Sequence, residues 1–499
     1  MQLFLSSLAQ IMTPMILLYI LLGVVMGLVF GAIPGLTGTM AIALCLPLTF
    51  GMDPTTAFAL LIALYIGGIS GGLVSAILIN IPGTPSSVAT TFDGAPMAKN
   101  GQAGKALGAG TFYSMIGNIF GIAVMIFVAP LLAQVALKFG VYEYTAVSLF
   151  ALSLVSGLAG KSITKGLVSC AVGMLLGCFG AAPIDGYARF TFGISGLEAG
   201  FASVPALVGL YALKELLAEA KPTGKVKILN VDTHIKGLGF SKKEFITQIP
   251  NMFRSALIGA WIGILPGIGG ATANIMAYGI AKKRSKYPEK FGTGIIDGVV
   301  ASETANNATI GGAMIPLLTL GIPGDAVTAI LLGTFTIHGL QPGPLFFSQN
   351  YDLIYTIFAA MVVASIVTFL VQFFGMRGFI KVLKLPKHIL LPIVIVLCVV
   401  GSFGVNNRLF DAWVLIIFGL IGYAMSKFDY PLAPIILGFI LGPITETYLR
   451  RGLQLSKGSF LPFLTRPISG VFIVLTVAFI ALTVINGIRK SKRTEAKNV

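Results

Sequence analysis

The chain has 499 residues, of which 56% are hydrophobic and only 10% are charged, whereas a soluble protein carries about 25% charged residues. So few charges cannot cover several soluble domains, and the composition therefore excludes an ordinary soluble enzyme and favours a polytopic helical membrane protein. The net charge of +16 comes from basic residues in short segments between apolar runs, which is typical of cytoplasmic loops and gives no reason to expect a nucleic-acid partner.

No charged residue precedes Asp53, so the N-terminus lacks the basic segment of a cleavable signal peptide, and we expect the first helix to stay as a signal anchor. The apolar runs are continuous rather than alternating, which excludes a strand-based barrel. Several runs are short or interrupted by Pro-Gly, so we expect an all-α fold with about 11–12 transmembrane helices and some half-helices or re-entrant hairpins. The apolar segments are 14–33, 36–50, 56–80, 106–135, 143–159, 163–180, 200–218, 252–281, 294–320, 326–347, 352–375, 388–405, 411–427, 431–448 and 467–488.

One long polar stretch divides the chain near its middle. It covers 219–250, is rich in lysine, and predicts a basic cytoplasmic linker. On this basis we expect a first membrane repeat at 1–218, a second at 251–488, and a basic cytoplasmic tail at 489–499.

Three landmarks recur in the same order in the two halves and predict an internal duplication. The glycine ladder that leads into Pro34 and Gly35 recurs before Pro266 and Gly267. Farther along, 81–84 (Ile-Pro-Gly-Thr) recurs as 322–325 (Ile-Pro-Gly-Asp), and then Asp-Gly at 93–94 aligns with His-Gly at 338–339.

Loop charge indicates that the two repeats are inverted. The loop 282–290 holds five basic residues and one acid, whereas the matching loop near Asp53 holds no Lys or Arg, so matching loops are expected on opposite sides of the membrane. Two observations do not fit this topology. Three apolar segments lie between the basic loops 282–290 and 377–388, so one of them must fail to cross the membrane if both loops are cytoplasmic. The basic loop with Arg450 and Arg451 would also lie on the non-cytoplasmic side, against the positive-inside rule. A partner-docking surface, a substrate-attracting patch and a different topology all remain open for these arginines.

The first candidate motif is the Pro-Gly break that follows each glycine ladder. Glycine at every fourth position permits close helix packing, which is one explanation of the ladder, but a break repeated in both halves frees backbone groups at membrane depth and indicates a binding site near the bilayer midplane. Because the first 52 residues carry no charge, we expect the first break to hold an anion through backbone N–H groups and hydroxyls alone. The substrate candidates here are Pro34, Gly35, Thr37, Gly38, Pro266, Gly267, Gly270 and Thr272.

The second candidate motif is the Pro-Gly turn at 80–87 with its partner at 321–325. Pro-Gly followed by Ser or Thr starts a helix well, and such an N-terminus attracts an anion, although a simple capped loop would have the same sequence. Because Asp325 stands where the first half has Thr84, we expect the anion at the first turn and a coupling cation at the second. The substrate candidates are Asn80, Pro82, Gly83, Thr84, Pro85, Ser86 and Ser87, and the ion candidates are Gly324 and Asp325.

The third candidate motif is the polar run Ser-Glu-Thr-Ala-Asn-Asn at 302–307, inside the apolar segment 294–320. Polar side chains are costly in a bilayer unless they face protein, water or a ligand, and hard oxygen ligands suit sodium. We assign Asn274, Glu303, Asn306 and Asn307 to a coupling-ion site, with an inter-helix hydrogen-bond cluster as the alternative.

Nothing in the sequence favours catalysis. Gly-Ile-Ser-Gly-Gly at 68–72 fits a hydrolase pattern but lies in an apolar segment, the three histidines are far apart, and no nucleotide-binding P-loop is present. The four cysteines lie in apolar runs without metal-ligand spacing, so we expect neither a zinc site nor a disulfide. No cofactor is expected beyond a coupling Na+ or H+.

These motifs resemble the large membrane subunit of tripartite tricarboxylate transporters. The resemblance runs from about residue 14 to about residue 470 and is carried by the Pro-Gly segments near Pro34, at 81–87, 266–272 and 321–325, and by Ser-Glu-Thr-Ala-Asn-Asn-Ala at 302–308. It implies a multi-pass permease of the bacterial inner membrane that works with a small membrane subunit of about four helices and a periplasmic substrate-binding protein.

The resemblance further implies uptake of a tricarboxylate such as citrate, driven by an ion gradient rather than by ATP. The mechanism expected is elevator-like alternating access, in which the two turns clasp the carboxylate and a sodium ion. An anion channel and a secondary transporter for a different organic anion are the alternatives.

Overall fold

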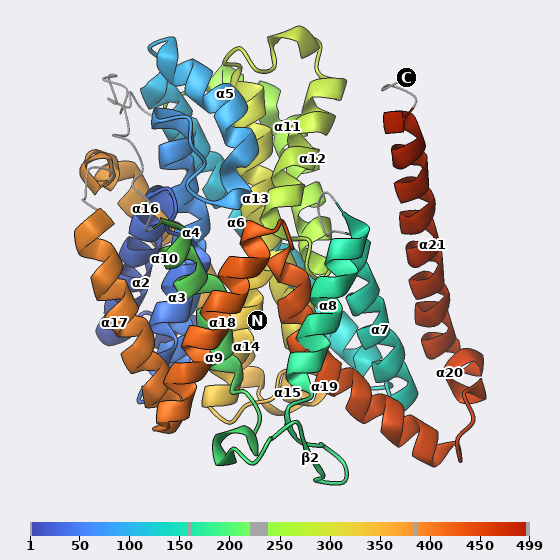
Figure 1. Cartoon of the computed structure of the whole chain (residues 1–499). Helices are drawn as coiled ribbons and strands as arrows, with labels where there is room; N and C mark the ends of the chain where they lie inside the picture. Colours follow the sequence, from blue (N-terminus) through green and yellow to red (C-terminus); the bar gives the residue numbers. More distant parts are fainter. Residues whose placement is uncertain (1, 158–161, 220–237, 383–386, 496–499) are drawn as a thin grey trace. The chain divides into compact units, whose positions relative to one another are not determined.

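A computed structural model describes residues 2–157, 162–219, 238–382 and 387–495 (Figure 1). These residues are helical and irregular apart from one antiparallel pair of two-residue strands, β1 (Gly180–Ala181) and β2 (Ala188–Arg189), which confirms the expected all-α fold. Most of the expected linker at 219–250 lies outside the described residues, as do the last four residues of the expected tail at 489–499.

The chain forms two compact units, each built from two stretches of sequence. Unit 1 comprises Met1–Ala133 and Tyr211–Asn407, and unit 2 comprises Gln134–Leu210 and Arg408–Val499. The first expected repeat, 1–218, therefore supplies 1–133 and 211–218 to unit 1 and 134–210 to unit 2, and the second, 251–488, supplies 251–407 to unit 1 and 408–488 to unit 2.

The helices of unit 1 are α1 (Gln2–Ile11), α2 (Pro14–Ala32), α3 (Gly38–Cys45), η1 (Pro47–Thr49), α4 (Pro54–Leu78), η2 (Pro85–Ser87), α5 (Val88–Lys99), α6 (Ala103–Ala136), α10 (Lys214–Glu219), α11 (Lys242–Ile264), α12 (Gly269–Arg284), η5 (Pro288–Lys290), α13 (Ile296–Leu320), α14 (Ala326–Ile337), α15 (Pro344–Gln349), α16 (Tyr351–Val382) and α17 (Lys387–Asn406). Here α6 runs past the end of the unit. Those of unit 2 are α7 (Val141–Gly157), α8 (Ile163–Gly177), η3 (Ser195–Leu197), α9 (Ser203–Val208), η4 (Gly209–Leu213), α18 (Leu409–Lys427), α19 (Leu432–Leu455), α20 (Leu461–Thr465) and α21 (Pro467–Glu495), and η4 continues into unit 1.

Six helices are long and apolar enough to cross a membrane. The count refers to the described residues, and the spans are Pro14–Ala32, Pro54–Leu78, Ala103–Ala136, Tyr351–Met376, Leu409–Lys427 and Leu432–Leu455. The chain is therefore a multi-pass membrane protein, and shorter apolar helices such as Ile163–Gly177 and Ala326–Ile337 accompany the spans.

Two helices, α4 and α13, form the interior of unit 1. Every residue of α4 from Thr56 to its end is buried, and so is every residue of α13 from Gly298 to Thr319. The sequence explains one end of each helix. At the start of α4, Asp53 is the N-cap and Pro54 is the first helical residue. At the end of α13, Gly321 adopts the left-handed conformation that terminates a helix.

The glycine ladders bring a second helix onto each of these interior helices. A Cβ on Gly27 of α2 would come within 2.4 Å of the Leu64 carbonyl oxygen of α4, and one on Gly263 of α11 within 2.6 Å of the Thr309 carbonyl oxygen of α13. Backbones can approach this closely only where side chains are absent. The pairs α2–α4 and α11–α13 are thus packed in the same way.

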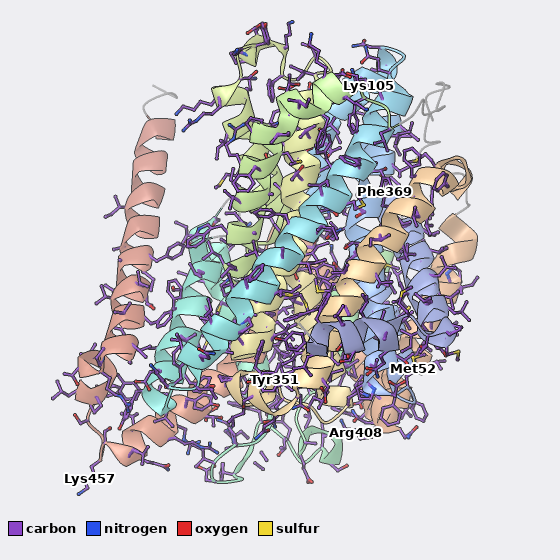
Figure 2. All side chains as sticks on the ribbon, turned by 180° about the vertical axis from the view of Figure 1, so that it is seen from behind. Met52, Lys105, Tyr351, Phe369, Arg408 and Lys457 are labelled. Atoms are coloured by element: carbon purple, nitrogen blue, oxygen red, sulfur yellow. The ribbon has the colours of Figure 1, made fainter. Side chains whose placement is uncertain are left out.

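The loop between α3 and α4 and the loop between α12 and α13 lie at opposite ends of unit 1. Figure 2 shows Met52, in the first loop, at the end opposite Lys105. The second loop lies beside the end of α5, at the other end of unit 1 (Figure 1), where the Asn100 side chain donates to the Thr293 carbonyl oxygen at 3.2 Å.

Candidate functional site

The first break separates α2 from α3. Gly35 adopts a φ of +89°, which only glycine accepts easily, and Thr37 caps α3 by accepting the Met40 N–H at 3.1 Å. Pro34 and Gly35 are half-buried, and Gly38 packs against Gly68 of α4.

A carboxylate lies at this break, beside the backbone N–H groups and hydroxyls that the sequence analysis considered there. A Cβ on Gly35 would come within 2.0 Å of Glu219 Oε1, so the end of α10 places its carboxyl group directly on the turn. The sequence analysis considered charges only near the break in sequence, whereas Glu219 arrives from the far end of the first half.

The second break separates α11 from α12 and is joined to the second turn. Gly267 and Gly269 both have positive φ, and the Gly267 N–H donates to the Gly324 carbonyl oxygen at 2.8 Å. Pro266 is buried. Gly324 also lies against Ala313 of α13 and against the Gly263 carbonyl oxygen, so this break and this turn form one packed unit.

The first turn lies between α4 and α5. Thr84 and Ser87 form a capping box, in which the Ser87 hydroxyl donates to the Thr84 carbonyl oxygen at 2.9 Å. Gly83 is buried against the Gly31 carbonyl oxygen and Pro82 is half-buried, whereas Asn80, with a φ of 55°, and Pro85 are exposed. The hydroxyls of Thr84 and Ser87 thus cap the turn and lie against Gly72 of α4, whereas the Ser86 hydroxyl lies against Gly270 of α12.

The second turn is capped by Asp325. Its Oδ1 accepts the backbone N–H and the hydroxyl of Thr328, both at 2.8 Å, and its Oδ2 accepts the Tyr65 hydroxyl of α4 at 2.5 Å. This carboxylate therefore makes hydrogen bonds through both oxygens, and it ties α14 to α4.

Glu303 and Asn307 occupy one face of α13 and are surrounded by hydrogen-bond donors. The Glu303 carboxylate accepts from the hydroxyls of Thr90 at 2.5 Å and Ser114 at 2.9 Å, and the Asn307 carbonyl oxygen accepts from the Ser70 hydroxyl at 2.8 Å and the Asn118 amide at 3.3 Å. Glu303, Asn307 and their partners are almost fully buried. Four helices, α4, α5, α6 and α13, thus contribute to one polar cluster.

Asn306 points elsewhere and is unsatisfied. It is fully buried, and neither its amide nitrogen nor its amide oxygen has a hydrogen-bond partner within the described part of the chain. A Cβ on Gly270, at the start of α12, would come within 2.6 Å of the Asn306 amide oxygen and 3.0 Å of the Ser86 hydroxyl oxygen. The first turn, the second break and α13 therefore meet at one point.

The remaining predicted residues do not reach this point as ligands. Asn274 is buried and fully engaged, since it accepts the Ala89 N–H at 2.6 Å and donates to the Ser302 carbonyl oxygen at 3.3 Å. Thr272 is exposed. Asn274 holds α5, α12 and α13 together around the site.

The sequence analysis missed several residues of these clusters. Five of them are polar side chains in the long apolar helices α4, α6 and α16, where a polar residue is itself a signal of an interior polar contact, and the sixth, Thr90, lies in α5. They are Tyr65, Ser70, Thr90, Ser114, Asn118 and Gln372, the last donating to the Ser70 carbonyl oxygen at 2.9 Å.

Asp93 is a further missed residue. Its Oδ1 accepts the backbone N–H groups of Gly292, Gly294 and Ile295 at 2.9–3.1 Å, and its Oδ2 accepts the Tyr278 hydroxyl at 2.9 Å. It fixes the segment that leads into α13 against α5.

In unit 2, Arg450 is ion-paired. It contacts Asp185 at 2.6 Å and Glu446 at 3.1 Å, and Arg189 contacts the same glutamate at 2.8 Å. Hydrogen bonding from Arg450 holds the pKa of Asp185, in the loop between β1 and β2, below its ordinary value of 3.8. Arg451 is exposed.

Broken helices that gather polar side chains inside an apolar, multi-pass fold are typical of membrane transport proteins. Residues 17–437 match the Tripartite tricarboxylate transporter TctA family, and the chain belongs to that family. It is the large membrane subunit of a tripartite system, a permease and not an enzyme.

Two curated relatives come from Agrobacterium vitis. An uncharacterised 52.8 kDa protein in the TAR-I ttuC' 3' region is 35% identical over 466 residues, covering 92% of this chain and 91% of the relative. An uncharacterised protein in the TAR-II ttuC' 3' region is 35% identical over 237 residues, covering 48% of this chain and 98% of the relative. No solved structure matches the chain.

Proposed function

We propose that the chain takes up a tricarboxylate or related carboxylate, such as citrate, across the bacterial inner membrane, driven by a gradient of Na+ or H+. It works with a small membrane subunit and a periplasmic substrate-binding protein, as its family implies. The observation that carries this proposal is the meeting of the first turn, the second break and α13 around the unsatisfied amide of Asn306.

The site suits a carboxylate. The N-terminus of α12 offers backbone N–H groups and the positive end of a helix dipole, and Ser86 and Asn306 add neutral donors. A substrate anion is held in this way without burying a Lys or Arg in the membrane interior.

Coupling is assigned to the cluster around Glu303. A buried carboxylate that is contacted by hydroxyl and amide groups is costly to keep ionised in an apolar interior, and either a proton or a sodium ion relieves that cost. Glu303 and Asn306 are three residues apart on α13. An ion bound to the Glu303 cluster can therefore affect the position of Asn306 and the affinity of the carboxylate site.

An inverted repeat supports alternating access by an elevator-like movement. The packing of α2 on α4 matches that of α11 on α13, Thr84 and Asp325 both cap the helix that follows a Pro-Gly turn, and the matching loops lie at opposite ends of unit 1. With the shorter apolar helices counted, about 11–12 segments cross the membrane, and the C-terminus is cytoplasmic.

Uptake of labelled citrate into proteoliposomes that contain both membrane subunits and the binding protein tests the proposal. Accumulation that requires an imposed Na+ or pH gradient is the expected result. Downhill flux that no gradient alters would favour the anion channel instead. If Ser86→Ala, Ser87→Ala and Asn307→Ala all left uptake intact, the site assignment would be wrong.

A further inference from the structure

The proposed transport site leaves a basic surface at one end of unit 2 without a role. The segments 134–146 and 443–470 carry five basic residues and two acidic ones. They lie where α7 begins, α19 ends and α21 begins. Phe463 of α20 packs on Tyr142 of α7, with ring centroids 5.0 Å apart, and lies against Gly452 of α19. The charged residues of these segments are therefore brought to one end of the unit.

Both acidic residues of these segments are already paired. Arg466 Nε lies 2.9 Å from Glu143 Oε1, and an Arg450 guanidinium nitrogen lies 3.1 Å from Glu446 Oε1. Figure 2 shows Lys457 beyond the helix ends, pointing away from the ribbon. Three basic side chains are exposed and have no ion pair or hydrogen bond among the residues that the structure describes: Lys138, Arg451 and Lys457.

Exposed apolar side chains accompany these cations. They lie at the end of α19, in the turn that follows and in α20, and each is 60–69% exposed: Leu455, Phe460, Leu461 and Leu464. Leucine and phenylalanine next to lysine and arginine at the ends of apolar helices are typical of the membrane–water interface, where acyl chains cover the apolar groups and the cations reach the headgroups. We name these three cations and four apolar residues the α20 patch.

The preference for basic residues on the cytoplasmic side does not explain the α20 patch. The helix α21 leads from Arg466 to the basic segment 489–499, and its 29 residues are enough to cross the membrane once. The topology proposed above places that segment in the cytoplasm, so the patch faces the opposite leaflet, where loops rarely carry a positive excess. Because both acidic residues nearby are paired, the counter-charge must come from outside the chain.

We propose that the α20 patch binds an anionic phospholipid of the non-cytoplasmic leaflet, whose phosphate pairs with the free cations and whose acyl chains cover the exposed apolar side chains. This role goes beyond the proposed transport function and involves no substrate. An acidic face of a soluble partner would also supply negative charge. It would approach from the water, however, and would not explain exposed leucines at the ends of membrane helices. A lipid accounts for both the cations and the leucines.

The test is lipid binding to the purified full-length chain in neutral detergent, followed by native mass spectrometry, which resolves each bound lipid and gives its dissociation constant. Dioleoylphosphatidylglycerol is compared with dioleoylphosphatidylcholine, which has the same acyl chains but no net charge. The anionic lipid is expected to bind about tenfold more tightly, and added salt is expected to reduce the difference. Glycerol phosphate, which has the phosphate without the chains, is expected not to displace it.

The double variant Arg451→Gln with Lys457→Gln is expected to bind phosphatidylglycerol about tenfold more weakly or worse and to bind phosphatidylcholine as before, because only the charge is removed. Lys282→Gln with Lys283→Gln is the matched control. It removes two exposed lysines from the last turn of α12, outside the patch, and is expected to retain the tightly bound lipid. An unchanged unfolding temperature without lipid shows that both variants fold.

The apolar part of the patch has its own variant. Leu461→Gln removes an apolar side chain that is 63% exposed, so it is expected to fold normally and to weaken the binding of both lipids.

Three results would overturn the inference. Equal affinity for the two lipids would remove the role of the charge. Unchanged phosphatidylglycerol binding by Arg451→Gln with Lys457→Gln would place the lipid elsewhere, and loss of an acidic soluble protein by that same variant would assign the patch to the protein. Equal weakening by the patch variant and the control variant would show a general attraction to basic residues instead of a site.

Discussion

At the scale of single residues, α13 has two polar faces in different states. Glu303 and Asn307 have their hydrogen bonds satisfied by neighbouring helices, whereas Asn306, between them in sequence, has none within the described residues. Native interiors satisfy most buried polar groups, so an exception marks a place where something else is expected to bind. The contrast distinguishes the proposed carboxylate position from the proposed coupling position on one helix.

Gly270→Ala tests this position without removing any polar group. The added methyl group would lie 2.6 Å from the Asn306 amide oxygen and 3.0 Å from the Ser86 hydroxyl oxygen, so these two side chains of the proposed site must shift. Carboxylate binding is expected to fall at least tenfold, while the protein still folds. Calorimetric titration with citrate measures the loss, and unchanged affinity would show that the substrate lies elsewhere.

The ion pair of Asp185 with Arg450 gives a pH prediction outside the membrane. Because the pKa of Asp185 in the folded protein lies below 3.8, the pair stabilises the fold fully above that pH, and the stabilisation is lost as the pH falls through the lower folded value. Asp185→Asn is therefore expected to lower the unfolding temperature at pH 7 and to match the wild type at the acid end. A difference that stays constant from pH 7 to pH 3 would contradict this.

At the scale of elements, helix pairs depend on glycine where backbones touch. Gly263→Ala would force a methyl group within 2.6 Å of the Thr309 carbonyl oxygen and 2.9 Å of the Gly312 Cα, so α11 must move away from α13. We expect a loss of about 1–3 kcal/mol, typical of overpacking. Thermal unfolding in detergent measures it.

Gly279→Ala provides the control for that substitution. Gly279 lies in α12, is exposed, and has no atom near its Cβ position. Removing a helical glycine there is expected to stabilise the protein by up to about 1 kcal/mol. Equal destabilisation by both variants would show that the close contact is not the cause.

The sequence was enough to predict the elements and breaks but not the partners of the polar residues. Pro-Gly at 34–35 and 266–267 and the turn before Asp325 all fall between helices, because the backbone rules for Pro and Gly are local. Glu219 on Gly35 and Tyr65 on Asp325 could not be foreseen, since both contacts join residues far apart in sequence. Likewise, Asn306 and Asn307 are adjacent and look alike, and only their opposite surroundings distinguish them.

At the scale of the whole molecule, all four interruptions lie in unit 1. Unit 1 holds α2–α5 and α11–α14, and the helices of unit 2 have no Pro-Gly break among the described residues. We propose that, in an elevator-like mechanism, unit 1 carries the substrate, because all four interruptions lie within it.

Glu303→Gln is expected to separate coupling from transport. The glutamine keeps the size of the side chain but neither binds a proton nor neutralises a sodium ion at this position. Exchange of labelled for unlabelled citrate across the membrane should persist, while accumulation against a gradient should be lost. Full accumulation by this variant would place the coupling ion elsewhere.

The central claim is that this permease couples carboxylate uptake to an ion gradient through the site on α13. Its most direct test is the accumulation ratio of labelled citrate in proteoliposomes with the complete tripartite system, measured with an imposed Na+ or pH gradient and again after an ionophore collapses it. We predict an internal concentration well above the external one that falls to equality with the ionophore, and no accumulation by Gly270→Ala. A ratio that stays at one under every gradient, or accumulation by Gly270→Ala equal to that of the wild type, would contradict the account.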